Sequence, residues 1–178
     1  MPRIWKRSRS LAVKIALNST PLIFLAKTDS VQLITSLFNA VIDNYVYEEV
    51  VSTGIKKGLR GAKLVKSLVD NGEVKLIELK NVEPIASSLK VGYGEISTIT
   101  LVKRGYAEIA IIDDRYARNV AKAYGVKVHG TLFLLLMGVK KRVISRDEAL
   151  DILADMVREG FRISPEVIAE FSRKIRSL

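Results

Sequence analysis

The chain has 178 residues, 48% of them hydrophobic, and a formal net charge of +10 from 29 Lys and Arg against 19 Asp and Glu. A chain of this length can bury a core as one domain, and its basic charge favours a polyanionic partner, with nucleic acid first. It has no cysteine and a single histidine, His129, which excludes disulfides, thiolate metal sites and multi-histidine zinc centres. Any metal must therefore be held mainly by oxygen, which points to Mg²⁺ or Mn²⁺.

Hydropathy and composition favour a cytoplasmic protein that does not enter a membrane. The longest apolar run, residues 132–139, is broken by Gly138 and is far shorter than the ~20 residues of a bilayer span. The basic N-terminus begins like a signal peptide, but Lys14 and Asn18 interrupt the apolar stretch too early. The single glutamine, Gln32, among many charged residues favours a thermophilic source.

The first half of the chain alternates strands with helices. Residues 1–10 form a basic arm whose Arg and Lys side chains could contact phosphates. A strand over residues 11–17 ends at Asn18, and Ser19 or Thr20 then caps a helix with Pro21 in its first position. Further elements are predicted in the following order: a helix from about residue 30, a strand at 41–42, helices from about 45 and from about 59, a turn at 71–72 and a strand at 74–79.

The second half continues the alternation and ends in helices. Gly92-Tyr93-Gly94-Glu95 opens a helix, and residues 109–112 form an apolar strand that stops at Asp113 and Asp114. A helix over 115–124, a strand at 126–128 and a buried helix over 131–139 follow. Residues 141–178 form a helical extension packed on the α/β domain of residues 11–140, with a capping box at Ser145 and Glu148 and a last helix from Ser164. This order predicts an α/β fold with a largely parallel sheet.

Oxygen-bearing side chains recur where these strands end or helices begin. They are Asn18 after the first strand, Glu49 on the helix after the second, Glu95 at the start of a helix, and Asp113 and Asp114 after the apolar strand. In open α/β sheets the carboxyl ends of strands form the ligand-binding edge. Converging carboxylates that hold Mg²⁺ suit phosphodiester hydrolysis, which needs no histidine.

In their order and spacing these segments resemble the PIN-domain nucleases, and most closely a prokaryotic PIN-like subgroup related to toxin–antitoxin ribonuclease toxins. The resemblance covers about residues 11–138. It rests on Asn18-Ser19-Thr20-Pro21-Leu22-Ile23, on residues 46–51, on Gly92-Tyr93-Gly94-Glu95, on residues 111–118 and on Val128-His129-Gly130-Thr131.

The resemblance implies a three-layer α/β/α sandwich, a C-terminal helical extension and a Mg²⁺- or Mn²⁺-dependent ribonuclease. Glu49, Glu95 and Asp113 would be acidic site residues and metal ligands, with Asp114 as a fourth acid. Asn18 stands where PIN domains usually have Asp, so it could bind a metal through its amide oxygen without adding charge. Glu49 is chosen over Glu48 from the Val-Tyr-x-Glu-Val-Val pattern.

Basic residues supply candidate contacts to RNA. Lys56, Arg60 and Lys63 share one helix face, and Arg115 and Arg118 follow the acidic pair. Such residues give affinity for the phosphate backbone without sequence choice. An antitoxin-like protein and a second copy of the chain are further partners that the family tendency favours.

Each motif also has a structural interpretation. Asp114 alone would cap the next helix, Glu95 alone would complement the dipole of its helix, and a row of lysines is usually a solvated face. Two other functions stay open: a PIN-like module that binds RNA or a protein without cleavage, which Asn18 motivates, and a receiver-like phosphoacceptor domain. The receiver fold needs its acidic pair early in the chain, whereas Asp113 and Asp114 come late.

Overall fold

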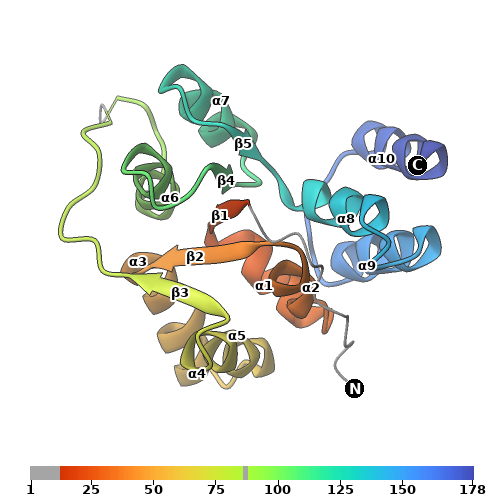
Figure 1. Cartoon of the computed structure of the whole chain (residues 1–178), viewed down its shortest axis with the longest axis horizontal. Coiled ribbons are helices and arrows are strands. Elements are labelled where there is room, and N and C mark those ends of the chain that lie inside the picture. Colours follow the sequence, from red (N-terminus) through yellow and green to blue (C-terminus); the bar gives the residue numbers. More distant parts are fainter. Residues whose placement is uncertain (1–12, 86–87) are drawn as a thin grey trace.

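The computed structural model describes residues 13–85 and 88–178 (Figure 1). The basic arm predicted for residues 1–10 and the first two residues of the first predicted strand lie outside this part of the chain. In the described ranges, no helix is long and apolar enough to cross a bilayer.

A parallel sheet forms the middle of the molecule, as predicted. Its five strands lie in the order β3-β2-β1-β4-β5, and every neighbouring pair is parallel. The strands are β1 (Lys14–Leu17), β2 (Asn39–Asp43), β3 (Val74–Ile77), β4 (Ile109–Ile111) and β5 (Val128–His129). The central strand, β1, therefore has β2 on one side and β4 on the other, and their carboxyl ends meet at one edge.

Helical segments connect the strands and continue beyond them. They are α1 (Ser19–Lys27), α2 (Gln32–Leu37), α3 (Asn44–Tyr47), the π-helical turn η1 (Glu48–Ser52), α4 (Thr53–Lys56), α5 (Arg60–Asp70), α6 (Tyr93–Lys103), α7 (Arg115–Ala123), α8 (Thr131–Lys140), α9 (Arg146–Arg158) and α10 (Pro165–Ser177). The capping box predicted for α9 is confirmed, since Glu148 N donates to Ser145 Oγ (3.1 Å) and Ser145 N to Glu148 Oε2 (2.8 Å).

Alternating side chains divide the core between the two faces of the sheet. On β1, Ile15 and Leu17 pack with residues of α1, α5 and α8, whereas Ala16 faces the opposite side with Leu101 of α6. On the same side as α6, Ala110 of β4 packs against α7. Helices thus cover both faces (Figure 1), which confirms the three-layer α/β/α fold.

Two local predictions are corrected. Asn18, rather than Ser19 or Thr20, is the N-cap of α1, and its Oδ1 accepts from Ser19 N (2.5 Å). The extended backbone of Asn18 continues β1, and the helix starts at Ser19, two residues before the predicted first position at Pro21. The last strand begins at Val128 rather than at Val126, because Val126 N still donates to Ala121 O (2.9 Å) and so completes the end of α7.

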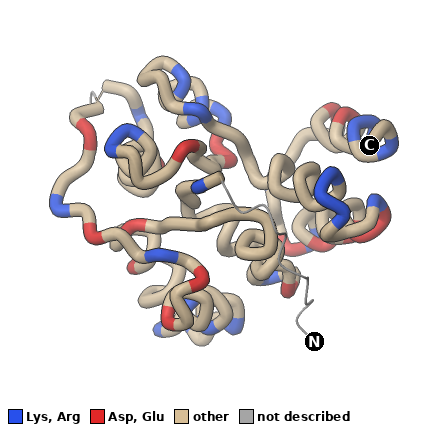
Figure 2. Tube along the Cα trace, viewed as in Figure 1, with Lys and Arg blue, Asp and Glu red and all other residues tan. Residues whose placement is uncertain are grey.

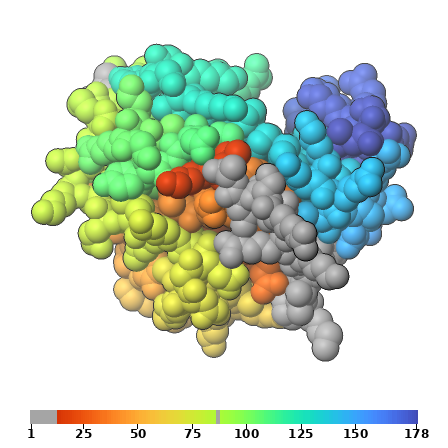
Figure 3. Space-filling model, in the orientation of Figure 1, coloured from red at the N-terminus to blue at the C-terminus, as the bar shows by residue number. Residues whose placement is uncertain are grey.

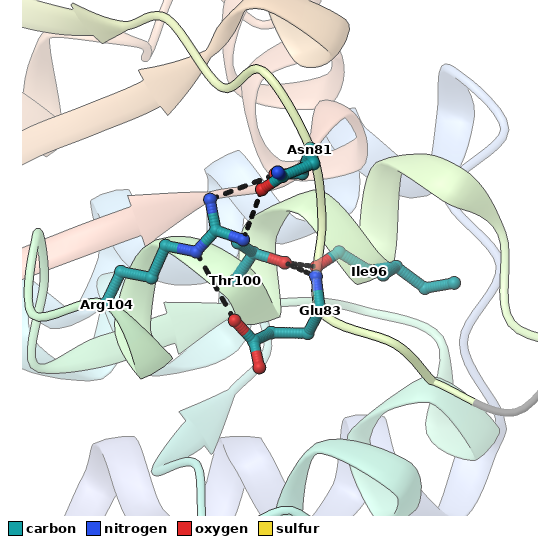
Figure 4. Close-up of polar contacts among 5 residues, drawn as sticks. All are labelled: Asn81, Glu83, Ile96, Thr100 and Arg104. Carbon is teal, nitrogen blue, oxygen red and sulfur yellow. Dashed lines mark hydrogen bonds and ion pairs between the residues drawn. The ribbon is translucent and has the colours of Figure 1, made fainter.

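The long connection from β3 to α6 is fastened to α6 by a polar cluster (Figure 4). Arg104 donates from Nη2 to Asn81 Oδ1 (2.7 Å) and from Nε to Glu83 Oε1 (3.3 Å). Thr100 Oγ1 accepts from Glu83 N (2.9 Å) and donates to Ile96 O (2.7 Å). These contacts hold the first part of the connection against the C-terminal end of α6.

Candidate active site

The carboxyl ends of three adjacent strands present polar side chains. Asp43 ends β2, Asn18 follows β1 and Asp113 comes shortly after β4. The register pairs Ala16 with Val41, so continuing it by two residues places Asn18 beside Asp43. Asn18 N also donates to Ile111 O (3.1 Å) at the end of β4. Because neighbouring strands lie about 4.8 Å apart, this edge concentrates the oxygen donors of the sheet.

Asn18 and Glu49 converge beside Gly94 in the first turn of α6. A Cβ placed on Gly94 would lie 3.5 Å from Asn18 Oδ1 and 3.6 Å from Glu49 Oε2. Ser19 Oγ donates to the same oxygen of Glu49 (2.5 Å) and links it to the start of α1. Segments that are distant in sequence thus direct two oxygen atoms at one small space that glycine leaves open.

Both neighbouring glutamates lie in the first turn of the π-helical segment η1, but their side chains have different partners. Glu48 lies 3.9 Å from Lys56 Nζ, and both side chains are exposed, whereas Glu49 reaches Ser19. Single π-helical turns inside α-helices are frequent at functional sites. Of the two glutamates, Glu49 is therefore the one that lies next to Asn18.

Glu95 lies in the first turn of α6, and its carboxylate folds back over the start of its own helix. A Cβ on Gly92 would clash with Glu95 Oε2. In this position the charge complements the positive end of the helix dipole. The glycine at the helix start leaves the room that the carboxylate occupies.

Asp113 is held by the start of α8. Its Oδ1 accepts from Thr131 N (2.7 Å) and its Oδ2 from Thr131 Oγ1 (2.6 Å). Burial raises the pKa of Asp113, while the two hydrogen bonds from Thr131 and the charge of Arg118 act in the opposite direction. Arg118 donates from Nη1 to Ile112 O (3.1 Å) and to Asp113 O, and a Cβ on Gly130 would lie 2.9 Å from Asp113 Oδ1. Asp113 is thus fixed in orientation.

Asp114 acts as a helix cap. Its Oδ1 accepts from Ala117 N (2.7 Å) and its side chain is exposed at the start of α7. This is the capping contact that the structural interpretation of Asp114 predicts, and it uses one of the two carboxylate oxygens.

The acidic residues do not form a closed metal cage. In residues 13–85 and 88–178, no three His, Cys, Asp or Glu side chains gather into a group that could hold a metal ion. The amide of Asn18 lies outside that set of residue types. Mg²⁺ usually keeps several waters and takes only one or two protein carboxylates, with substrate phosphate completing its shell. The oxygens of Asn18 and Glu49 beside Gly94 fit such a sparse, all-oxygen site.

The comparisons with known proteins identify the family. The family whose sequence model matches residues 14–177 is described as a PIN domain. The chain is a PIN domain. This match confirms the family suggested by the sequence motifs. PIN domains are generally nucleases and typically depend on divalent metal ions. No curated protein matches this PIN domain.

Two solved structures are similar to the PIN domain in fold. One is a PilT N-terminus domain protein from the hyperthermophilic archaeon Sulfolobus solfataricus P2, which is 18% identical, with 68% of this chain and 89% of that chain covered and a TM-score of 0.46. The other is a domain of a functionally unknown protein from Methanocaldococcus jannaschii DSM 2661, with 15% identity, coverage of 67% and 91%, and a TM-score of 0.45.

The candidate RNA-binding residues occupy two separate places on the PIN domain. Lys56 and Arg60 are ion-paired with Glu48 (3.9 Å) and Asp29 (3.1 Å), and Lys63 is exposed on α5. The prediction that these three share one helix face is wrong, because Lys56 ends α4 and a turn at Gly58 separates it from α5. In Figure 1, α5 and α7 lie on opposite sides of the molecule. Arg115 and Arg118 lie on α7 instead, beside Asp113, and Figure 2 shows basic positions recurring along that helix.

Sequence reasoning missed Asp43, which is fully buried and caps α3. Its Oδ1 accepts from Tyr45 N (2.9 Å) and Val46 N (3.0 Å), and its Oδ2 has no hydrogen-bond partner in the described part of the chain. The nearby Ser97 hydroxyl donates to Gly94 O (2.9 Å) instead. Burial raises the pKa of Asp43, against the smaller opposing effects of its hydrogen bonds and Ser97. The signal was available, because Asp43 ends an apolar strand just as Asp113 does.

Replacing Asp43 with asparagine should stabilise the fold at neutral pH. Asn is as good an N-cap as Asp, so Oδ1 can keep its two bonds, while the amide that replaces Oδ2 carries no charge that burial would penalise. Because the folded-state pKa of Asp43 lies above its ordinary value of 3.8, the wild type loses stability as pH rises through the interval between them. The free energy of unfolding of Asp43→Asn should equal that of the wild type at the acid end of this interval and exceed it above the interval.

Urea unfolding of both proteins between pH 4 and pH 8 measures this difference. Asp151→Asn, at an exposed position of α9, is the matched control and should keep the pH profile of the wild type. A gap between Asp43→Asn and the wild type that shrinks as pH rises would contradict the assignment of a buried, uncompensated carboxylate.

Proposed function

We propose that this PIN domain is a metal-dependent endoribonuclease that hydrolyses RNA phosphodiester bonds with Mg²⁺ or Mn²⁺. The observation that carries the proposal is the convergence of Asn18 Oδ1 and Glu49 Oε2 on the space beside Gly94. The membership of the chain in a family of nucleases and its net charge of +10 support the same conclusion.

Each polar residue has a separate role in this proposal. Asn18 and Glu49 hold the ion from the central strand and from η1, and Ser19 keeps the Glu49 carboxylate in place. Glu95 and Asp113 complete the acidic edge, and Asp113 retains lone pairs for a ligand because each carboxylate oxygen has two. Asp114 assists from the start of α7.

The reaction is attack by water on the phosphorus, in line with the departing oxygen. A bound divalent ion supplies positive charge at the scissile phosphate and makes the attacking water more acidic. Arg118, fixed against the carbonyl oxygens of residues 112 and 113, places its guanidinium where it can bind a phosphate oxygen. The protein then contributes mainly orientation and charge.

The test is cleavage of a labelled RNA by the purified protein with Mn²⁺ and with EDTA, next to the variant Gly94→Ala. Gly94 has helical backbone, and the added methyl would sit 3.5 Å from Asn18 Oδ1, in ordinary contact. We expect folding stability to be retained and Mn²⁺ affinity and cleavage to fall by roughly tenfold or more. Cleavage that persists in EDTA, or an unchanged Gly94→Ala enzyme, would contradict the proposal.

A second candidate function is a PIN domain that binds RNA or an antitoxin-like protein without cleaving. Asn18 favours it, because an amide in place of a carboxylate weakens the attraction for the ion. Millimolar Mn²⁺ that produces neither binding heat nor cleavage would favour this function. In both cases we place the protein in the cytoplasm, acting as a homodimer.

A further inference from the structure

A basic cavity opens beside Asp113, between α7 and the segment that precedes α10. Its volume is about 490 Å³, within the range of about 300–1,000 Å³ that is usual for ligand sites. Figure 3 shows the surface hollowed between these two parts of the chain. The loop between α9 and α10, with Val167 of α10, thus forms one wall of the cavity, and the other wall begins at Asp113.

Four cationic side chains line this cavity, and Asp113 is its one acidic lining residue among those described. They are Arg115, Arg118 and Lys122 from α7, and Arg162 from the loop after α9. The three on α7 are spaced by three and four residues, so they share a face of the helix. The side chains of Arg115, Lys122 and Arg162 form no ion pair with any acid that the structure describes.

The lack of ion pairs on its cationic side chains distinguishes this cavity from the basic residues Lys56, Arg60 and Lys63 on α4 and α5. There, two of the three basic residues, Lys56 and Arg60, are paired with Glu48 and Asp29. Around the cavity, the positive charges remain available to a ligand. The same charges affect His129, a lining residue, since its pKa is lowered first by burial and then by Lys127, Lys122 and Arg118.

We propose that this cavity binds the phosphate backbone of a single-stranded nucleic acid and that Lys122 and Arg162 clamp the strand next to Asp113. The inference rests on the proposed function in one respect, that the bound strand is the substrate of the adjacent centre. Arginine offers paired donors to phosphate oxygens and lysine a compact charge, so two walls of this chemistry match a polyphosphate strand. The C-terminal extension, through Arg162, is then part of the substrate site.

The test measures binding of a fluorescein-labelled hexauridylate in EDTA, by anisotropy, at several salt concentrations. The double variant Lys122→Gln/Arg162→Gln removes one charge from each wall, and both positions are exposed. We expect roughly tenfold or greater weakening at low salt, and a salt slope reduced by about 1.4, since each contact to a single strand contributes ~0.7.

The matched control is Lys75→Gln/Arg146→Gln, which removes one Lys and one Arg at exposed positions outside the cavity. It should weaken binding by less than about threefold. Because His129 is the single histidine, its ring signals provide a second readout. They should shift when hexauridylate is added to the wild type and stay unshifted in the cavity variant at the same concentration.

Several outcomes would overturn the inference. One is an equal loss of hexauridylate affinity in the cavity and control variants, and another is a loss of affinity in Lys56→Gln/Lys63→Gln alone. A third is binding of hexaglutamate as tight as that of hexauridylate, which would indicate an acidic protein partner. If the cavity variant weakens binding of a hexadeoxyuridylate by the same factor as binding of hexauridylate, the cavity recognises the phosphate backbone. If only the affinity for hexauridylate falls, the cavity recognises an RNA strand. Binding of hexauridylate that depends on the cavity, without Mn²⁺-dependent cleavage, would contradict the proposed nuclease function but support this binding site.

Discussion

Asp113→Asn is expected to reduce Mn²⁺-dependent RNA cleavage by roughly 10–100-fold, the usual effect of removing a group that supports a bound metal ion. The substitution removes the negative charge but not the hydrogen bond from Thr131 N, which the amide oxygen can still accept. Thr131 Oγ1 can turn to accept from the new amide group. The fold should therefore survive, and single-turnover cleavage rates measure the loss.

The control for this variant is again Asp151→Asn on α9, which makes the same chemical change at an exposed position. It should cleave at the rate of the wild type. Melting curves in EDTA show whether either variant is misfolded. Full cleavage by a correctly folded Asp113→Asn protein would remove Asp113 from the active centre.

Asn18→Asp is expected to tighten Mn²⁺ binding by at least roughly tenfold, because it adds a full charge where an amide now stands. The buried side chain keeps its size, and the new carboxylate can still accept from Ser19 N. Without metal, the added charge faces the Glu49 carboxylate across the space beside Gly94 and should destabilise the protein. With Mn²⁺ the stability should recover beyond that of the wild type.

Calorimetric titration with Mn²⁺, and melting temperatures with Mn²⁺ and with EDTA, test this pair of effects. Asn71→Asp, at the exposed end of α5, adds the same charge far from the carboxyl edge of the sheet and should leave Mn²⁺ affinity unchanged. An Asn18→Asp protein with the Mn²⁺ affinity of the wild type would mean that Asn18 does not face the ion.

The fold could be predicted because its signals are local. The apolar run at residues 109–112 is buried on both faces of the sheet, and helical spacing marks most helices to within a few residues. The errors occur where a contact decides the boundary. Asn18 caps α1 through its own side chain, and the backbone of Val126 still closes α7.

The candidate site was less accessible to sequence reasoning, since it depends on contacts between distant segments. Asn18, Glu49 and Gly94 meet only after three elements pack together. The motif that carries the family resemblance contains Gly94, but it did not indicate that this glycine leaves the space between Asn18 and Glu49. Arg162 lies 49 residues after Asp113 in the chain, and nothing local marks it as a neighbour of the same cavity. Asp43, by contrast, carried the same signal as Asp113 and was overlooked.

In the proposed function, an otherwise basic protein directs the oxygens of Asn18 and Glu49 at one divalent ion. Anomalous diffraction from a crystal soaked in Mn²⁺ tests it most directly. We expect a strong anomalous peak beside Gly94, between the side chains of Asn18 and Glu49. A peak elsewhere, or no peak with Mn²⁺ at millimolar concentration, would contradict it.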